Sequence, residues 1–377
     1  MTSPTPLAGL TVVEFTHMVM GPSAGAILGA LGAEVIRVEP PGGDATRALV
    51  GSGAGFFAMY NRHKSSVCLD LKSAEGIAQA KALVATADIL IENFRPGALD
   101  RLGLGYEALS VDNPRLIHCS LKGFLDGPYQ DRTALDEVAQ MMGGLAYMTG
   151  PPGRPLRAGT SVIDVTGGMF GIIAVLAAVE ERHRTGRGGK VQASLFETTV
   201  YLVGQHMAQL AVTGKAAAPM PARISAWGIY DVFETADEPL FVGVVTDSLW
   251  AKFCDLFGLA DLFADPRLQG NNDRVREREW LVPRLRELFA CMTRAEIVAK
   301  LEGTGMPHAP IGRPEDMFDD PHLLASGGLE AVTLADGRET VLPALPVALD
   351  GVRPGGPFAL PEPGAQQSLL NRTLSKD

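Results

Sequence analysis

The sequence predicts an α/β protein with a mostly parallel sheet and a second, smaller domain. The N-terminal part alternates strand and helix patterns, which is typical of a parallel sheet. Residues 169–179 form an unbroken apolar run that predicts a helix buried on nearly every side. Residues 214–222 are rich in small residues and proline, as linkers are. The chain has 377 residues, and single cores stop growing at roughly 250 to 300 residues, so we expect two domains.

The elements expected first are a strand, a helix and a strand at 10–15, 21–32 and 34–39. The patterns that follow predict strands at 65–69, 88–91, 115–121 and 190–194. Between and after these strands we expect helices at 74–86 and 197–213 and a short helical turn at 98–102. This order is that of a nucleotide-binding α/β sheet.

The apolar helix ends at basic residues and Gly186, so we expect its start between Asp164 and Gly168. Aspartate is a common helix N-cap, and Thr166 is an equally good one. Gly167 and Gly168 are poor helix residues, at about 1 kcal/mol each against alanine. They predict a glycine-rich turn that something approaches closely, so capping and a functional role for Asp164 both stay open.

The predicted domains are a large one over 1–213, a linker over 214–222 and a small α+β domain over 223–329. Within the small domain, 229–234 and 240–245 predict a hairpin, and 248–302 predict helices with charged faces. Residues 330–377 are rich in proline and glycine, and we expect them to pack back on the large domain.

Composition excludes several classes of function. The net charge is −10 without acidic or basic blocks, which disfavours binding to nucleic acid or to an anionic membrane. The four cysteines are scattered and the histidines form no ligand pair, so we expect neither disulfides nor a metal site. No export signal or membrane-spanning run is evident, and a reduced, cytoplasmic protein is expected.

Several segments in order resemble the family III CoA-transferases, also called the CaiB/BaiF family, which includes formyl-CoA transferase and the α-methylacyl-CoA racemases. The matching segments within residues 7 to about 330 are Leu7–Leu10, Glu14–His17, Gly21-Pro22, Leu31–Glu39, Asn61, Lys64-Ser65, Leu69–Lys72, Glu92–Gly97, Asp136–Gln140, Thr149-Gly150, Arg157–Gly159, Asp164 and Thr185–Gly188. The resemblance implies a Rossmann-like large domain, a smaller domain, an interlocked homodimer and a CoA site near the domain interface.

The resemblance places the catalytic nucleophile at Asp164. A carboxylate can attack an acyl-CoA thioester to give a mixed anhydride, and the CoA thiolate then converts the anhydride into an aspartyl-CoA thioester. The expected oxyanion or turn support is Gly167 and Gly168. CoA is a substrate here, and no bound cofactor is expected. The residues carried over as CoA contacts are His17, Arg37, Leu69, Lys72, Asn93, Phe94, Ala98 and Arg101.

The residue before Asp136 separates the branches of the family. Racemases resemble this chain but carry a histidine there, which pairs with the aspartate to move an α-proton. This chain has Leu135, which favours transfer over racemisation. Formyl-CoA transferase has a tyrosine there and a tetraglycine loop, whereas residues 214–240 contain only Gly214 and Gly228. Both differences count against formyl-CoA and oxalate as substrates.

We therefore predict transfer of CoA from succinyl-CoA, or a similar dicarboxylyl-CoA, to a small carboxylic acid. The candidate acceptor-binding residues are Leu135, Asp136 and Arg157, and Arg132 and Arg223 could also bind a distal carboxylate. The alternatives are a racemase or epimerase, an idle CoA-binding protein and a nicotinamide-dependent dehydrogenase. The segment 15–21 is not G-x-G-x-x-G, which weakens the dehydrogenase hypothesis.

Overall fold

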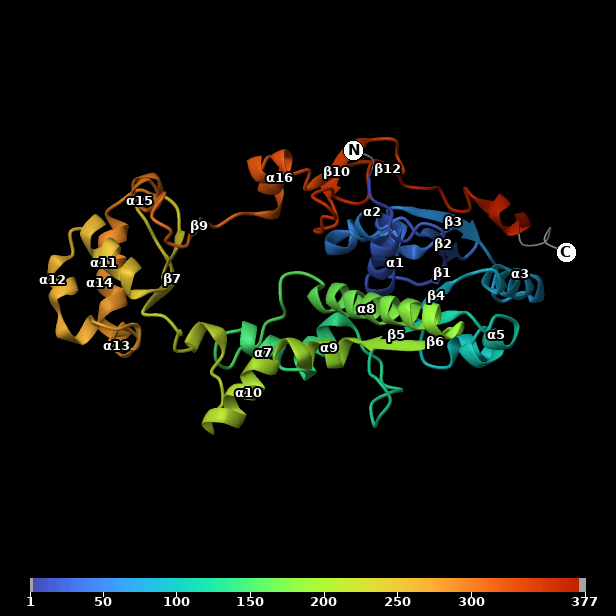
Figure 1. Ribbon diagram of the computed structural model, residues 1–377, viewed down its shortest axis with the longest axis horizontal. Helices are drawn as coiled ribbons and strands as arrows, with labels where there is room; N and C mark the ends of the chain where they lie inside the picture. Colours follow the sequence, from blue (N-terminus) through green and yellow to red (C-terminus); the bar gives the residue numbers. More distant parts are fainter. Residues whose placement is uncertain (1–2, 373–377) are drawn as a thin grey trace. The chain divides into compact units, whose positions relative to one another are not determined.

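The computed structural model describes residues 3–372, and the chain divides into two compact units (Figure 1). The first unit runs to Pro221 and resumes at Asp320, and the second is Ala222–Asp319. The change at Ala222 falls at the end of the predicted linker. The sequence placed the other boundary after residue 329, ten residues later than the structure does.

The first unit contains a six-stranded parallel sheet, which confirms the predicted fold class. The strands are β1 (Thr11–Phe15), β2 (Glu34–Glu39), β3 (Lys64–Cys68), β4 (Ile89–Glu92), β5 (Ile117–Lys122) and β6 (Gly189–Ser194). Their order is β3-β2-β1-β4-β5-β6, the doubly wound order of dinucleotide-binding folds. In the central strand, Val12 pairs with Val35 on one side and with Ile89 on the other.

Helices cover both faces of this sheet because alternate strand residues point to opposite faces. Val12, Ile89 and Cys119 share a core with the two helices α1 (Met20–Ala30) and α8 (Val162–Thr185). Val13 and Leu90 face a second core beneath α3 (Ala74–Ala85), α4 (Ala98–Arg101) and α5 (Tyr106–Asp112). The remaining helices before the linker are α2 (Phe56–Tyr60), α6 (Asp136–Met142), α7 (Leu145–Thr149), α9 (Leu195–Leu202) and α10 (Gly204–Thr213).

The helix expected over 197–213 is two helices. Ser194 caps α9 by accepting a hydrogen bond from the Glu197 N–H at 3.3 Å, and the helix ends at Leu202. The chain then turns at Val203, and α10 starts at Gly204. The sequence pattern misses this break because the apolar residues continue through it.

Helix α8 starts earlier than expected and contains the two glycines, so the predicted glycine-rich turn is wrong. Gly167 and Gly168 lie inside the helix, which begins at Val162. It ends at Thr185, and Gly186 is its C-cap, as predicted. As predicted, another part of the chain lies very close to these glycines, and that part is helix α1. A Cβ on Gly167 would lie 2.7 Å from Met20 Cε, and one on Gly168 would lie 2.7 Å from the Met20 carbonyl oxygen and closer still to Ser23 Oγ.

The expectation that α8 is buried all round is also wrong for this chain. Met169, Ile173 and Leu176 are 47%, 60% and 38% exposed, and their i, i+4, i+7 spacing puts them on one face of the helix. We call these three residues the apolar stripe. By length and composition alone α8 could cross a membrane, contrary to expectation. In the structure its other face packs on α1 and β5 (Figure 1).

The second unit is built on an antiparallel sheet with the order β7-β8-β9. The expected hairpin is present as β7 (Ile229–Phe233) and β8 (Leu240–Val244), and β9 (His308–Pro310) pairs with β8. The expected helices are α11 (Asp247–Leu256), α12 (Ala260–Ala264), α13 (Asn271–Arg276), α14 (Arg278–Ala290) and α15 (Arg294–Leu301). Trp250, Phe253 and Phe289 fill the core between them.

The last segment lies on the first unit. It contains α16 (Pro321–Ala325), β10 (Leu329–Thr333), β11 (Glu339–Pro343) and β12 (Phe358–Ala359). Further on, the Gln366 N–H donates to the Ser66 carbonyl at 3.0 Å, and the Gln367 side chain accepts from the Cys68 N–H at 2.9 Å. These bonds occupy backbone groups at the outer edge of β3.

The contact between α1 and α8 predicts that Gly168→Ala is destabilising. The new methyl group would overlap Ser23 and the Met20 carbonyl, and overpacking of this kind typically costs about 1–3 kcal/mol. Urea unfolding followed by circular dichroism should show a lower midpoint. Gly204→Ala is the matched control, because Gly204 also lies in a helix and its Cβ would meet nothing within 4 Å. Equal stability of the two variants would contradict the proposed packing.

Candidate active site

Asp164 lies in the first turn of α8, where it is half-buried. Among the described residues, no side chain of the helix itself caps this end: Ser161 makes no capping hydrogen bond, and Thr166 Oγ1 donates instead to the Val162 carbonyl at 2.6 Å. The cap comes from α6. Asp136 Oδ2 accepts hydrogen bonds from the N–H groups of Ile163 at 2.8 Å and Asp164 at 3.2 Å. Asp164 is therefore not the cap of α8, because Asp136 accepts the hydrogen bonds of its first N–H groups.

The other oxygen of Asp136 is also engaged. Oδ1 accepts from Gln140 Nε2 at 2.5 Å and from Arg157 Nη2 at 3.4 Å. Gln140 in turn accepts from the Ala158 N–H at 2.8 Å, and Arg157 pairs with Glu137 at 2.7 Å. Asp136 and Gln140 are buried, so this network fixes the lead-in to α8. Asp136 is a positioning residue in this structure and does not present a free carboxylate to an acceptor.

The same arrangement changes the acidity of Asp164. Burial and the negative charge of Asp136 raise the pKa of Asp164 to about 7, and the Arg157 guanidinium opposes them. Near neutral pH the group is therefore divided between acid and carboxylate. A carboxylate of raised pKa is more basic than an ordinary aspartate and becomes fully available only above neutral pH.

A cavity of about 290 Å³ opens beside the start of α8. It is lined by Ser52, Phe56, Tyr60 and residues 157–161. Burial and the charges of Asp164 and Asp136 raise the pKa of Tyr60, so its phenol stays protonated. Of the predicted acceptor residues, Arg157 lines this cavity. Leu135 is 60% exposed at the N-cap of α6 and offers no titratable group.

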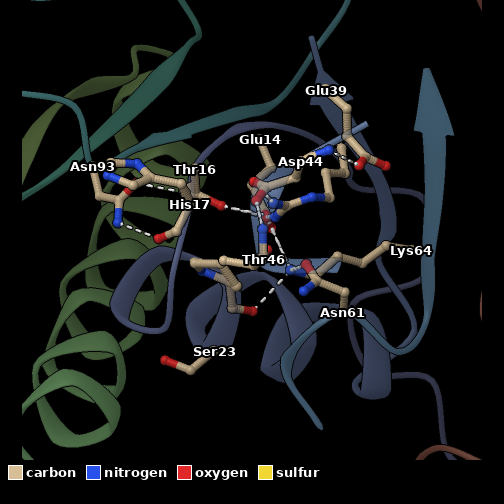
Figure 2. A network of polar contacts seen from close by, with 12 residues as sticks. Glu14, Thr16, His17, Ser23, Glu39, Asp44, Thr46, Asn61, Lys64 and Asn93 are labelled. Atoms are coloured by element: carbon tan, nitrogen blue, oxygen red, sulfur yellow. Dashed lines mark hydrogen bonds and ion pairs between the residues drawn. The ribbon is translucent and has the colours of Figure 1, made fainter. Parts of the chain in front are cut away.

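The predicted CoA contacts His17, Asn93 and Phe94 come together where β1 and β4 end. Asn93 Oδ1 accepts from the His17 N–H and Asn93 Nδ2 donates to the His17 carbonyl, both at 2.9 Å (Figure 2). The rings of His17 and Phe94 lie 5.8 Å apart. Glu92 holds the second loop by accepting from the Phe94 N–H at 2.9 Å. The carboxyl ends of parallel strands are where such sheets bind ligands.

Arg37 is not available to a ligand as predicted. It is 1% exposed, and its guanidinium binds Glu14 at 2.8 Å and Asp44 at 2.5 Å. Lys64 Nζ also binds Glu14, at 2.9 Å, and burial lowers the pKa of Lys64 to about 8. This buried cluster was not predicted from the sequence. The one local indication of it is Glu14, a charged residue within the otherwise apolar strand expected at 10–15.

The other predicted CoA contacts are spread along the same sheet edge. The Leu69 side chain lies in the hydrophobic core beside Val67 and Leu369 and offers no surface to adenine. Lys72 and Arg101 are exposed, and Ala98 borders a cavity of about 210 Å³. His118 also lines that cavity, is buried, and has a pKa lowered to about 4, chiefly by burial. Sequence analysis did not single it out.

Comparison with known proteins decides the family. The model of CoA-transferase family III matches residues 7–367. The chain belongs to CoA-transferase family III.

Relatives of this family III enzyme match it over nearly their full length. An acetyl-CoA:oxalate CoA-transferase from Acetobacter aceti is 35% identical over 96% of this chain and 94% of its own. A succinate–glutarate CoA-transferase from Agrobacterium fabrum is 34% identical over 90% of this chain and 88% of its own. The crystal structure of a CaiB/BaiF family protein from Brucella suis covers 99% of this chain and 100% of its own, with a TM-score of 0.87 and 32% identity. The predicted family is confirmed.

The environment of Asp164 predicts the pH dependence of this CoA-transferase. We expect the Asp164 carboxylate to be the reactive form, so kcat/KM should rise with pH through about 7 and then level off. Asp136→Asn removes a negative charge that raises this pKa, so the rise should move to lower pH. Asp112→Asn at the end of α5 is the control, because Asp112 is exposed and is not among the groups that shift the pKa of Asp164. An unshifted Asp136→Asn profile would contradict the account.

Proposed function

We propose that this enzyme moves CoA from an acyl-CoA donor to a small carboxylic acid through covalent intermediates on Asp164. The carboxylate attacks the donor thioester, the carbon–sulfur bond breaks, and the products are a mixed anhydride and CoA thiolate. The thiolate attacks the aspartyl carbonyl, which releases the first acid and leaves an aspartyl-CoA thioester. The acceptor carboxylate then reverses these two steps, so no net proton transfer is needed.

The observation that supports this proposal best is the half-buried Asp164 carboxylate in the first turn of α8, held in place through the Asp136 cap, with a cavity at the residues that lead into the helix. The raised pKa of Asp164 makes it a better nucleophile than an exposed aspartate. Racemisation instead requires an acid and a base on opposite faces of the α-carbon. The exposed Leu135 supplies neither, which supports transfer.

The donor and acceptor are proposed by analogy with relatives. Names of similar proteins include succinate–glutarate and acetyl-CoA:oxalate CoA-transferases. We propose succinyl-CoA or a similar dicarboxylyl-CoA as donor and a small dicarboxylate as acceptor. Leu135 and the lack of a tetraglycine segment disfavour oxalate, although one relative is named for it, so oxalate belongs in any substrate panel.

The first function test mixes the enzyme with succinyl-CoA and a panel of free acids, and follows new acyl-CoA species by mass spectrometry. Asp164→Asn should lower the rate by more than about a thousandfold, because the nucleophile is lost. Asp255→Asn, which changes an exposed aspartate of α11, should leave it unchanged. Full activity of Asp164→Asn would refute the proposal. So would α-deuterium exchange into 2-methylacyl-CoA in heavy water without CoA transfer, which would indicate a racemase.

We also propose that the enzyme is a cytoplasmic homodimer. The apolar stripe of α8 is a large exposed surface for a protein of this composition. The Phe170 and Tyr201 rings, 5.3 Å apart, extend it toward α9. A second copy of the chain would remove this surface from water, and the family resemblance implies the same.

The stripe predicts that Ile173→Glu weakens the dimer. A buried, unpaired carboxylate at an interface is strongly unfavourable, so light scattering should show a larger monomer fraction at equal concentration. Val111→Glu, at a β-branched residue of α5 that is also exposed, should leave the mass unchanged. A wild-type monomer, or an Ile173→Glu protein that stays dimeric, would exclude this interface.

A further inference from the structure

The start of α8 leaves no backbone N–H free for an oxyanion. The Val162 N–H donates to the Thr160 carbonyl at 2.8 Å and the Val165 N–H to the Ser161 carbonyl at 3.1 Å. Asp136 takes the N–H groups of Ile163 and Asp164. Further along the helix, each N–H bonds to the carbonyl four residues earlier. Gly167 and Gly168 therefore cannot supply the donors that the sequence suggested.

The reaction nevertheless creates an oxyanion. When Asp164 attacks the thioester, the carbonyl oxygen of the acyl group gains a negative charge, and a donor aimed at it typically contributes a factor of about 10²–10³ in kcat. Because the N–H groups of α8 are occupied, we consider the side-chain donors on the wall of the adjacent cavity. Those side chains are Ser52, Tyr60, Arg157, Thr160 and Ser161.

Arg157 is already committed within this group. Its guanidinium binds Glu137, Asp136 and the carbonyl oxygens of Ala158 and Thr160. Tyr60 is different: within residues 3–372, no hydrogen bond to its hydroxyl contributes to its pKa. It is close enough to Asp164 for the charge of that carboxylate to act on it. Ser161, which also lines the cavity, lies three residues before Asp164, about 5 Å along the helix axis.

Tyr60 is also held firmly. It is the last residue of α2, and the next residue, Asn61, is anchored by its Nδ2 to the Phe57 carbonyl at 3.2 Å and by its Oδ1 to Lys64 Nζ at 3.2 Å. Lys64 belongs to the buried cluster around Glu14 (Figure 2). A preorganised donor needs no reorganisation at the moment of reaction, which is the condition for effective oxyanion stabilisation.

We propose that the Tyr60 hydroxyl donates the hydrogen bond that stabilises the oxyanion formed when Asp164 attacks the acyl group. This role rests on the proposed function of Asp164. The aspartyl oxygen forms a bond to the acyl carbon, the carbon–sulfur bond breaks and the electron pair leaves on the CoA thiolate. Tyr60 keeps its proton throughout and only donates. Aliphatic hydroxyls such as Ser161 are weaker donors than a phenol, whose pKa is about 10.

The test is Tyr60→Phe, measured as kcat, KM and the rapid-quench rate of aspartyl-CoA formation. The expected result is a loss of about 10²-fold in kcat and in the covalent step, with KM changed little. Tyr147→Phe, which changes an exposed tyrosine of α7, should behave like wild type. Replacing Tyr60 by a fluorinated tyrosine, which keeps the shape and is a stronger acid, should retain or raise kcat, and this arm remains informative if Tyr60→Phe folds poorly.

A Tyr60→Phe protein with wild-type kcat would overturn the proposal, as would an effect confined to KM. A large loss in Ser161→Ala alone would assign the donor to Ser161 instead. Failure of this inference is distinguishable from failure of the proposed function. If Asp164→Asn is inactive while Tyr60→Phe is fully active, only the role of Tyr60 is wrong; if Asp164→Asn remains active, the covalent mechanism is wrong.

Discussion

The carboxylate of Asp136 is the constraint on which the site depends. One oxygen holds the first N–H groups of α8, and the other holds Gln140 and Arg157. The same charge raises the pKa of Asp164. A single buried side chain thus positions the proposed nucleophile, raises its basicity and occupies the first backbone donors of α8. Those N–H groups are therefore not available to stabilise an oxyanion.

Two features of the first unit keep this arrangement in place. Gly167 and Gly168 let α1 approach α8 more closely than any larger residue would allow, which ties the nucleophile's helix to the sheet. The buried cluster joins Glu14 of β1, Arg37 of β2 and Lys64 of β3, and Lys64 also binds Asn61, the residue that follows α2, the helix that carries Tyr60. Removing one member of such a cluster leaves buried charge without a partner, typically at about 3–5 kcal/mol.

Sequence patterns predicted the parallel sheet, most helix positions and the family, because strand alternation and ordered motifs are local properties. They failed where a partner distant in the chain decides the outcome. Asp136 caps a helix 27 residues away, so the sequence left capping by Asp164 open. The glycines predicted a turn because their close contact with α1 is not a local property. Arg37 was carried over from the family resemblance as a CoA contact, whereas its partner Glu14 lies on a neighbouring strand. The apolar stripe looked like core because composition does not show which face of an apolar helix is covered.

The most direct test of the covalent mechanism traces the oxygen atoms of the acceptor carboxylate with an isotope label. If the acceptor carboxylate is labelled with ¹⁸O, the last two steps leave one labelled oxygen on Asp164, because CoA thiolate attacks the acyl carbon of the acceptor anhydride. Mass spectrometry of the peptide that contains Asp164, after a single turnover with succinyl-CoA and labelled acceptor, should therefore show one ¹⁸O on that residue and none when the acyl-CoA is omitted. Transfer of CoA without label on Asp164 would contradict the account.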